Sequence, residues 1–311
     1  MNAVATGSIV DVFKEIGGRC GRRSKCLLGA TIAGIGVLAW AALVEPRRMV
    51  VRRSRLRLPH WPARLTGLRV AIVSDVHAGG PHVGDRRLEQ VVERVNREAP
   101  DLIVLLGDYV DPELPAVPPL PAVRPLPPER VATALERLRA PVGVVAVLGN
   151  HDWSNDGERV ADALRAVGAR VLENEAIELV ARGGPLWILG LADLRKRHPD
   201  LDAPMRVVPE DSPLLVLTHD PDVFPAVPAR VALTLAGHTH GGQIDVPWLR
   251  RRMIPSRFGA RYSAGHIEEG GRHLYVSQGV GTTGLPLRFR APAGIDVLEL
   301  LPGRDEDEEP R

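Results

Sequence analysis

Carboxylates, an amide and histidines follow a series of short apolar runs in this chain, and all of these side chains are ligands for divalent cations. In chain order they are Asp75, His77, Asp108, Asn150, His219, His238 and His240. Oxygen and imidazole ligands without a thiolate suit Mn, Fe, Zn or Ni rather than a softer ion. Seven ligands are too many for one tetrahedral ion. Two ions that share one carboxylate would use all seven.

Two divalent ions about 3.5–4 Å apart stabilise the attacking and leaving oxygens of phosphoryl transfer, with a bridging hydroxide as nucleophile. One such motif alone is weak, because Asp-x-His is often a turn and two histidines at i and i+2 are often surface residues. Here five short motifs contain these residues. They occur one after another along the chain, and each lies at the end of an apolar run. Five of the ten histidines fall inside them, namely His77, His151, His219, His238 and His240. The series therefore predicts a binuclear metal site.

The apolar runs must position these ligands. Their hydrophobicity is continuous, which predicts strands buried on both faces. They cover residues 68–74, 102–106, 142–148, 214–218 and 231–236. The carboxyl ends of neighbouring strands converge, and this is where open α/β sheets bind ligands. Residues i and i+2 of an extended segment point the same way, so Asp75 and His77 should reach one ion, and His238 and His240 one site.

Helical patterns lie between the runs. Apolar residues at i, i+3, i+4 and i+7 predict an amphipathic helix over 85–98. Val131, Leu135 and Leu138 indicate a second helix, and a third follows around Leu164. Alternating strands and helices predict an α/β core. From residue 176 onward the chain is rich in strand patterns, which predicts a second sheet packed on the first in one continuous domain.

The motifs together resemble those of the calcineurin-like metallophosphoesterase superfamily, over residues 68 to 300. They are Asp75-x-His77, Gly107-Asp108-x-x-Asp111, Gly149-Asn150-His151-Asp152, His219 and Gly237-His238-Thr239-His240. The segments 237–244 and 277–281 are most similar to the membrane-associated bacterial subgroup. The resemblance implies an α/β fold, a four-layer α/β/β/α sandwich preceded by one N-terminal transmembrane helix.

The resemblance also implies how two metal ions would be held. The first ion would bind Asp75, His77 and His240. The second would bind Asn150, His219 and His238, and Asp108 would bridge both.

Three further residues have roles that the resemblance or their chemistry implies. His151 would contact the phosphate and protonate the leaving alkoxide. Asp152 either orients the His151 imidazole or caps the following helix. Arg288 either contacts phosphate or lies in a surface or core ion pair.

Residues 26–44 carry no charge, and about 20 apolar residues are enough to cross a bilayer. We expect a retained single-pass anchor in a bacterial cell membrane. A cleaved signal is the alternative, since Arg22-Arg23 resembles a twin-arginine export signal and residues 39–41 a cleavage site. A buried helix is the third interpretation. Both flanks are basic, so the charge distribution leaves the sidedness open.

The remaining segments complete the predicted domain organisation. Residues 1–25 form a basic flank and 45–65 a basic linker; 66–301 form the catalytic domain, and 302–311 an acidic disordered tail. The proline-rich insertion 112–128 predicts a stiff exposed loop, with a lid over the site as the alternative.

The predicted function is hydrolysis of phosphodiester or pyrophosphate bonds in a membrane or envelope molecule, such as a phospholipid-like diester. The anchor and its adjoining arginines favour an anionic surface. The alternatives are a phosphomonoesterase, acting on proteins or small molecules and needing further cationic contacts, and a non-catalytic scaffold. A net charge of +2 and 4% aromatic residues give no reason to expect nucleic acid.

Overall fold

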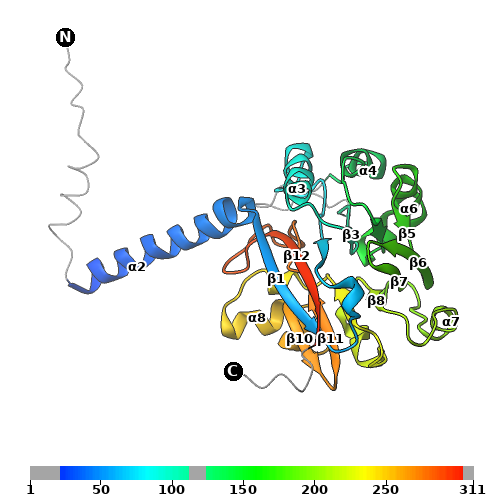
Figure 1. Ribbon diagram of the computed structural model, residues 1–311. Coiled ribbons are helices and arrows are strands. Elements are labelled where there is room, and N and C mark those ends of the chain that lie inside the picture. Colours follow the sequence, from blue (N-terminus) through cyan, green and yellow to red (C-terminus); the bar gives the residue numbers. More distant parts are fainter. Residues whose placement is uncertain (1–21, 112–123, 304–311) are drawn as a thin grey trace, which may run out of the picture.

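The apolar N-terminal segment forms one long helix that projects from the rest of the molecule (Figure 1). The computed structural model describes residues 22–111 and 124–303. The helix α2 (Arg22–Ala39) continues through a π-helical turn, Trp40–Val44, and a 3-10 turn, Glu45–Arg47. The stretch Lys25–Arg47 is long and apolar enough to cross a membrane, and almost all of it is exposed. Most of the basic flank, most of the proline-rich insertion and most of the acidic tail lie outside the described residues.

The first sheet carries the predicted parallel core. Its order is β1-β12-β2-β3-β4-β5. Strands β2 to β5 are parallel, β12 is antiparallel to β2, and β1 is parallel to β12. The strands are β1 (Val50–Leu58), β12 (Gly294–Pro302), β2 (Leu68–Val73), β3 (Leu102–Leu105), β4 (Gly143–Ala146) and β5 (Arg170–Val171).

The strand-rich second half forms a second sheet, as predicted, in the order β10-β11-β9-β8-β7-β6. Strands β7, β8, β9 and β11 are parallel, with the antiparallel strands β6 and β10 at the two edges. The strands are β6 (Glu175–Ala181), β7 (Gly184–Gly190), β8 (Leu214–Leu217), β9 (Leu233–Ala236), β10 (Gly265–Glu269) and β11 (Arg272–Val276).

Apolar side chains pack in three clusters. One joins the first sheet to the helices α3 (Asp85–Arg97), α4 (Pro128–Leu135) and α6 (Gly157–Ala166). A second fills the space between the two sheets. The third covers the outer face of the second sheet with the short α7 (Asp202–Met205) and the 3-10 turns Pro221–Ala226 and Gly259–Tyr262. The mixed α/β class with two sheets is confirmed, and the predicted outer helical layer consists on this side of short turns.

The predicted basic linker differs from the structure. Within 45–65, Val50–Leu58 forms the edge strand β1, paired with β12 along its whole length. Leu56 and Leu58 are buried between the sheets, whereas Arg55 and Arg57 point to solvent. An edge strand alternates apolar and polar residues, and the many arginines of this segment hide that pattern in its composition.

Candidate metal centre

The predicted ligands converge at one place, beyond the carboxyl ends of strands from both sheets. β2 and β3 lead into Asp75 and Asp108, and β8 and β9 lead into His219 and His238. Helix α5 (Asn150–Asn155) begins at the fourth predicted ligand position, just after β4. The carboxylates and imidazoles of the set are buried, so the two sheets together present a nearly water-free cluster of donors.

Asp75, His77 and His240 form a first group of converging ligand atoms. His77 Nε2 lies 3.0 Å from His240 Nε2. His240 Nε2 lies 3.4 Å from Asp75 Oδ1. This grouping matches the set predicted for the first ion.

Asp108, His219 and His238 form a second group. His219 Nε2 lies 3.2 Å from Asp108 Oδ2 and 3.1 Å from His238 Nδ1. His238 and His240 are therefore divided between the two groups, although only one residue separates them.

The carboxylate of Asp108 lies between the groups. Its Oδ2 is 3.2 Å from His219 Nε2 and 3.7 Å from His77 Nε2. Its Oδ1 accepts the backbone N–H of His151 at 2.8 Å. One oxygen thus faces both clusters while the other is fixed, which is the placement that a shared ligand needs.

Several ligands adopt an unusual backbone conformation. Five of the nine non-glycine residues with positive φ in the described part of the chain belong to the predicted set: Asp75, His77, Asp108, His238 and His240. The left-handed region costs an ordinary residue roughly 1–2 kcal/mol. The expectation that Asp75 and His77 pair as i and i+2 of an extended strand is therefore wrong in its reason. β2 ends at Val73, and the backbone turns sharply there to aim both side chains inward.

Two glycines make room for the carboxylates. A Cβ at Gly149 would overlap the Asp108 carboxylate, and a Cβ at Gly237 would lie 2.6 Å from Asp75 Oδ2. Real Cβ atoms do not approach so closely, so the sequence needs glycine at both positions, as its motifs predict.

The outer nitrogens of two histidines are held by backbone carbonyls. His219 Nδ1–H donates to the Leu106 carbonyl at 2.7 Å, and His238 Nε2–H donates to the Pro255 carbonyl at 3.2 Å. These contacts select the tautomers in which His219 Nε2 and His238 Nδ1 both carry lone pairs. Two lone pairs 3.1 Å apart repel unless a proton or a metal ion lies between them, so this pair of nitrogens can hold a metal ion.

The electrostatics of the cluster favour added positive charge. Burial lowers the pKa of His77, but Asp111 and the nearby carboxylates outweigh it and raise the value to about 9. Burial likewise opposes protonation of His219, whose pKa nevertheless lies well above its usual range because of Asp108. Burial would raise the pKa of Asp108, yet the charge of His219 holds it well below its usual value. Protons on histidines here provide charge that divalent ions would supply.

Known proteins with the same sequence pattern identify the family. The family model described as calcineurin-like phosphoesterase matches residues 68–242. The chain is 31% identical over 275 residues to the "Uncharacterized metallophosphoesterase YkuE" of Bacillus subtilis (strain 168), covering 88% of this chain and 92% of that protein. The chain belongs to the calcineurin-like phosphoesterases. With its cluster of metal-ligating side chains, it is a metal-dependent phosphoesterase and a hydrolase of phosphoesters.

Two other relatives of this phosphoesterase are longer than the chain. An "Uncharacterized metallophosphoesterase" of Helicobacter pylori (strain ATCC 700392 / 26695) is 29% identical over 76% of this chain and 60% of its own length. A "Transmembrane protein with metallophosphoesterase domain" of Danio rerio is 28% identical over 77% of this chain and 54% of its own length.

Asn150 and His151 lie side by side at the edge of the phosphoesterase centre. Both are half-buried, and Asn150 Oδ1 and His151 Nδ1 have no hydrogen-bond partner. His151 also groups with His77 and Asp108 as a set of converging ligand atoms. A buried amide oxygen without a partner is costly, so Asn150 Oδ1 is available to bind a cation.

Asp152 has a different role from the predicted orientation of His151. Its buried carboxylate accepts backbone N–H groups of Asp108, Tyr109 and Gly149 at 2.7, 2.8 and 2.9 Å, and that of Val110 at 3.3 Å. The Gly149 bond lies at the N-terminus of α5, so the helix-end alternative is the closer one, with Asp152 in the first turn rather than at the cap. Four backbone donors occupy the carboxylate, so it stabilises the 108–110 turn that carries Asp108.

Two residues of the centre were given no metal-site role by the sequence. Asp111 Oδ1 accepts from His77 Nδ1 at 2.7 Å and thereby orients that imidazole. The sequence signal for Asp111 was its place in the motif Gly107-Asp108-x-x-Asp111.

Arg288 is fully buried, lies 3.3 Å from His240 Nδ1, and donates to the carbonyls of Gly281 and Ala291. Among the described residues it has no ion-pair partner, because backbone carbonyls occupy its guanidinium, so the predicted ion pair is wrong.

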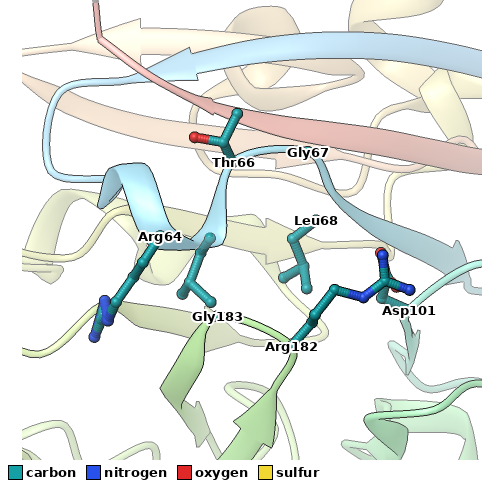
Figure 2. Close-up of a pocket in the computed structure, with 8 residues that line it drawn as sticks. Arg64, Thr66, Gly67, Leu68, Asp101, Arg182 and Gly183 are labelled. Atoms are coloured by element: carbon teal, nitrogen blue, oxygen red, sulfur yellow. The ribbon is translucent and has the colours of Figure 1, made fainter.

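A surface pocket lies at the amino-terminal end of β2, on the side of the first sheet opposite the candidate metal centre. Arg64, Asp101, Arg182 and Leu68 are among the residues that line it (Figure 2). The candidate ligands Asp75 and His77 follow the carboxyl end of the same strand, so this pocket is separate from the candidate metal centre.

Proposed function

We propose that the chain uses two divalent ions, drawn from Mn, Fe, Zn and Ni, to hydrolyse phosphodiester or pyrophosphate bonds. Asp75, His77 and His240 would hold the first ion. Asn150, His219 and His238 would hold the second, and Asp108 would contact both. The carrying observation is that Asp108 Oδ2 faces His219 Nε2 at 3.2 Å and His77 Nε2 at 3.7 Å. When bound, such a pair supplies Lewis acidity and lowers the pKa of water.

His151 is the candidate general acid. Its Nε2 lies 4.0 Å from Asp108 Oδ2 and 3.5 Å from Thr283 Oγ1, at the half-buried rim of the centre. Burial lowers its pKa. The ring is near enough to the cluster to contact a phosphate oxygen and to give a proton to the leaving oxygen.

The arginines near the centre favour a diester over a monoester. The pKa of His240 is lowered by burial and by the nearby charges of His77 and Arg288. The pKa of His238 is lowered by burial and, among other causes, by the charges of His219 and Arg195. Arg288 is bound to backbone carbonyls, and Arg195 pairs with Asp220 at 2.9 Å. A monoester dianion needs further cationic contacts, and both of these guanidinium groups are already engaged.

The location of the substrate follows from the helix. We propose that Lys25–Arg47 is a retained anchor in a bacterial cell membrane and that the substrate is a membrane or envelope molecule, such as a phospholipid-like diester. The exposed Arg47 and Arg48 at the end of the helix favour an anionic surface.

The test uses the full chain in detergent, stripped of metal and reloaded with manganese. Rates on bis(p-nitrophenyl) phosphate and p-nitrophenyl phosphate are compared, with His151→Ala as the control and bound metal counted per chain. We expect two ions and a faster metal-dependent rate on the diester. Faster turnover of the monoester would assign the chain to the phosphatases, and one ion with full activity would overturn the binuclear proposal.

A further inference from the structure

The membrane helix joins the domain on the side of the first sheet where the carboxyl ends of β2, β3 and β4 lie, which is also the side of the metal centre. β1 follows the helix directly, runs parallel to β12, and β12 is antiparallel to β2. The first residue of β1 therefore lies on the same side of the sheet as the last residue of β2. Val50 pairs with Gly294, whose N–H donates to the Gly279 carbonyl at 2.9 Å. A Cβ at Gly279 would lie 2.6 Å from Asp75 Cβ, so the junction is close to a candidate ligand.

The junction is fixed by buried and partly buried hydrogen bonds. The Ala41 carbonyl accepts the backbone N–H of Arg288 at 2.9 Å. The Arg87 guanidinium donates to the carbonyls of Arg47 at 2.9 Å and Arg48 at 3.0 Å. Glu45, in the 3-10 turn between them, is buried. Buried contacts of this kind are absent from a flexible tether, so the axis of the helix sets the orientation of the whole domain.

One loop connects this junction with the metal centre. Arg288 binds Ala41 through its backbone and approaches His240 with its side chain. Earlier in the same loop, Thr283 exchanges two hydrogen bonds with the Gln243 amide, at 2.8 and 2.9 Å. The Thr283 hydroxyl is also the nearest partner of His151 Nε2, at 3.5 Å. The loop 282–290 therefore forms the rim of the centre on the side of the helix.

Apolar side chains are exposed on this rim. Leu285, in the loop, is 41% exposed, and Trp248, in α8 (Pro247–Met253), is 73% exposed. The backbone N–H of Asp245, just before α8, donates to the Phe289 carbonyl at 2.8 Å, so the helix is tied to the loop. Figure 1 shows α8 on the side of the domain from which α2 leaves.

The same rim carries exposed positive charge. Arg252 in α8, Arg290 in the loop, and Arg47 and Arg48 at the junction are all exposed. Aromatic and aliphatic side chains flanked by arginines are suited to the headgroup region of an anionic bilayer. Continuity with the membrane helix selects the bilayer as the partner of this surface.

We infer that the rigid junction holds the metal-site rim against the bilayer, with Trp248 and Leu285 in the headgroup layer. The enzyme then hydrolyses phosphate esters of lipids in the membrane that anchors it. This inference deepens the proposed function and rests on it for the chemistry. The orientation stands on the contacts alone and can be tested without turnover.

The orientation is tested with the full chain in vesicles of about 3:1 phosphatidylcholine to phosphatidylglycerol, a surface of the anionic kind that the arginines favour. Cys20 and Cys26 are replaced with Ser, and an environment-sensitive fluorophore is attached at Leu285→Cys or, as the control, at Val207→Cys. Val207 is also an exposed apolar residue, far along the chain from the rim. We expect blue-shifted emission and quenching by headgroup-labelled lipid at 285 and neither at 207. Equal, water-like emission at both positions would overturn the inference.

The functional consequence is tested with two diesters, a long-chain alkyl p-nitrophenyl phosphate seated in the vesicles and the water-soluble bis(p-nitrophenyl) phosphate. The double variant Trp248→Glu, Leu285→Glu should lose about tenfold in rate on the embedded ester, the scale expected for removing a buried apolar anchor. Its rate on the soluble ester, and both rates of Val207→Glu, should be unchanged. Equal losses on both esters would contradict the inference. If the unaltered enzyme hydrolyses neither ester, the proposed function fails, while the fluorescence still decides the orientation.

Discussion

The carboxylate of Asp152 supports the backbone of Asp108, accepting its N–H at 2.7 Å inside a fully buried turn. The same carboxylate binds the N–H groups of Tyr109 and Gly149. The backbone of Asp108, which faces both ligand groups, is thus held by the carboxylate of Asp152, 44 positions later in the chain. These hydrogen bonds fix the position of Asp108 and leave its Oδ2, the oxygen that faces both ligand groups, unoccupied.

Replacing this support should cost stability. In Asp152→Asn an amide N–H₂ faces buried backbone donors, and each unpaired donor costs about 1–3 kcal/mol. We expect the melting temperature to fall by about 5–10 °C. Asp156→Asn, at the exposed N-cap of α6, is the control and should change it far less. An unchanged melting temperature with lost turnover would instead restore the prediction that Asp152 orients His151.

Loss of the proposed shared ligand should be the most damaging change at the centre. Asp108→Ala removes the one carboxylate that faces both groups, so we expect turnover to fall about 10³-fold or more. The metal content should also drop below that of Asn150→Ala, which removes a single proposed terminal ligand. Turnover and elemental analysis of both variants check this. Near-normal activity of Asp108→Ala would exclude the binuclear assignment.

The role of His151 can be separated from simple binding by the leaving group. A general acid contributes about 10²–10⁴-fold, and it matters most when the departing oxygen is a poor leaving group. We expect His151→Ala to slow hydrolysis of a dialkyl diester far more than that of bis(p-nitrophenyl) phosphate. Equal losses in kcat on the two substrates would point to phosphate contact rather than proton donation.

Arg288 should be structural. Burial lowers its pKa to about 9, and its guanidinium donates to the carbonyls of Gly281, Ala291 and Gln278. Lysine cannot reproduce this fork, so Arg288→Lys should lower the melting temperature by about 5 °C or more. The exposed neighbour variant Arg290→Lys is the matched control and should leave it unchanged. A stable Arg288→Lys protein with weaker substrate binding would instead support the predicted phosphate contact.

The strands and helices that position the site were readable because their signals are local. The run predicted over 68–74 is β2, and the pattern over 85–98 is α3. Strand β1 escaped prediction because its alternation is masked by arginines and because its partner β12 lies some 244 residues away in the chain. Pairing over such a distance leaves no mark in a local window.

The sequence by itself determined which Asp, Asn and His residues are the candidate ligands, since their positions after strand ends and beside glycines are local features. Only the tertiary structure decided how they are shared. It placed His238 with His219 and His240 with His77, because left-handed backbone at both positions turns neighbouring side chains apart. It also placed the end of the apolar N-terminal helix beside the candidate metal centre. That placement depends on strand order and direction, which arise from contacts between distant segments.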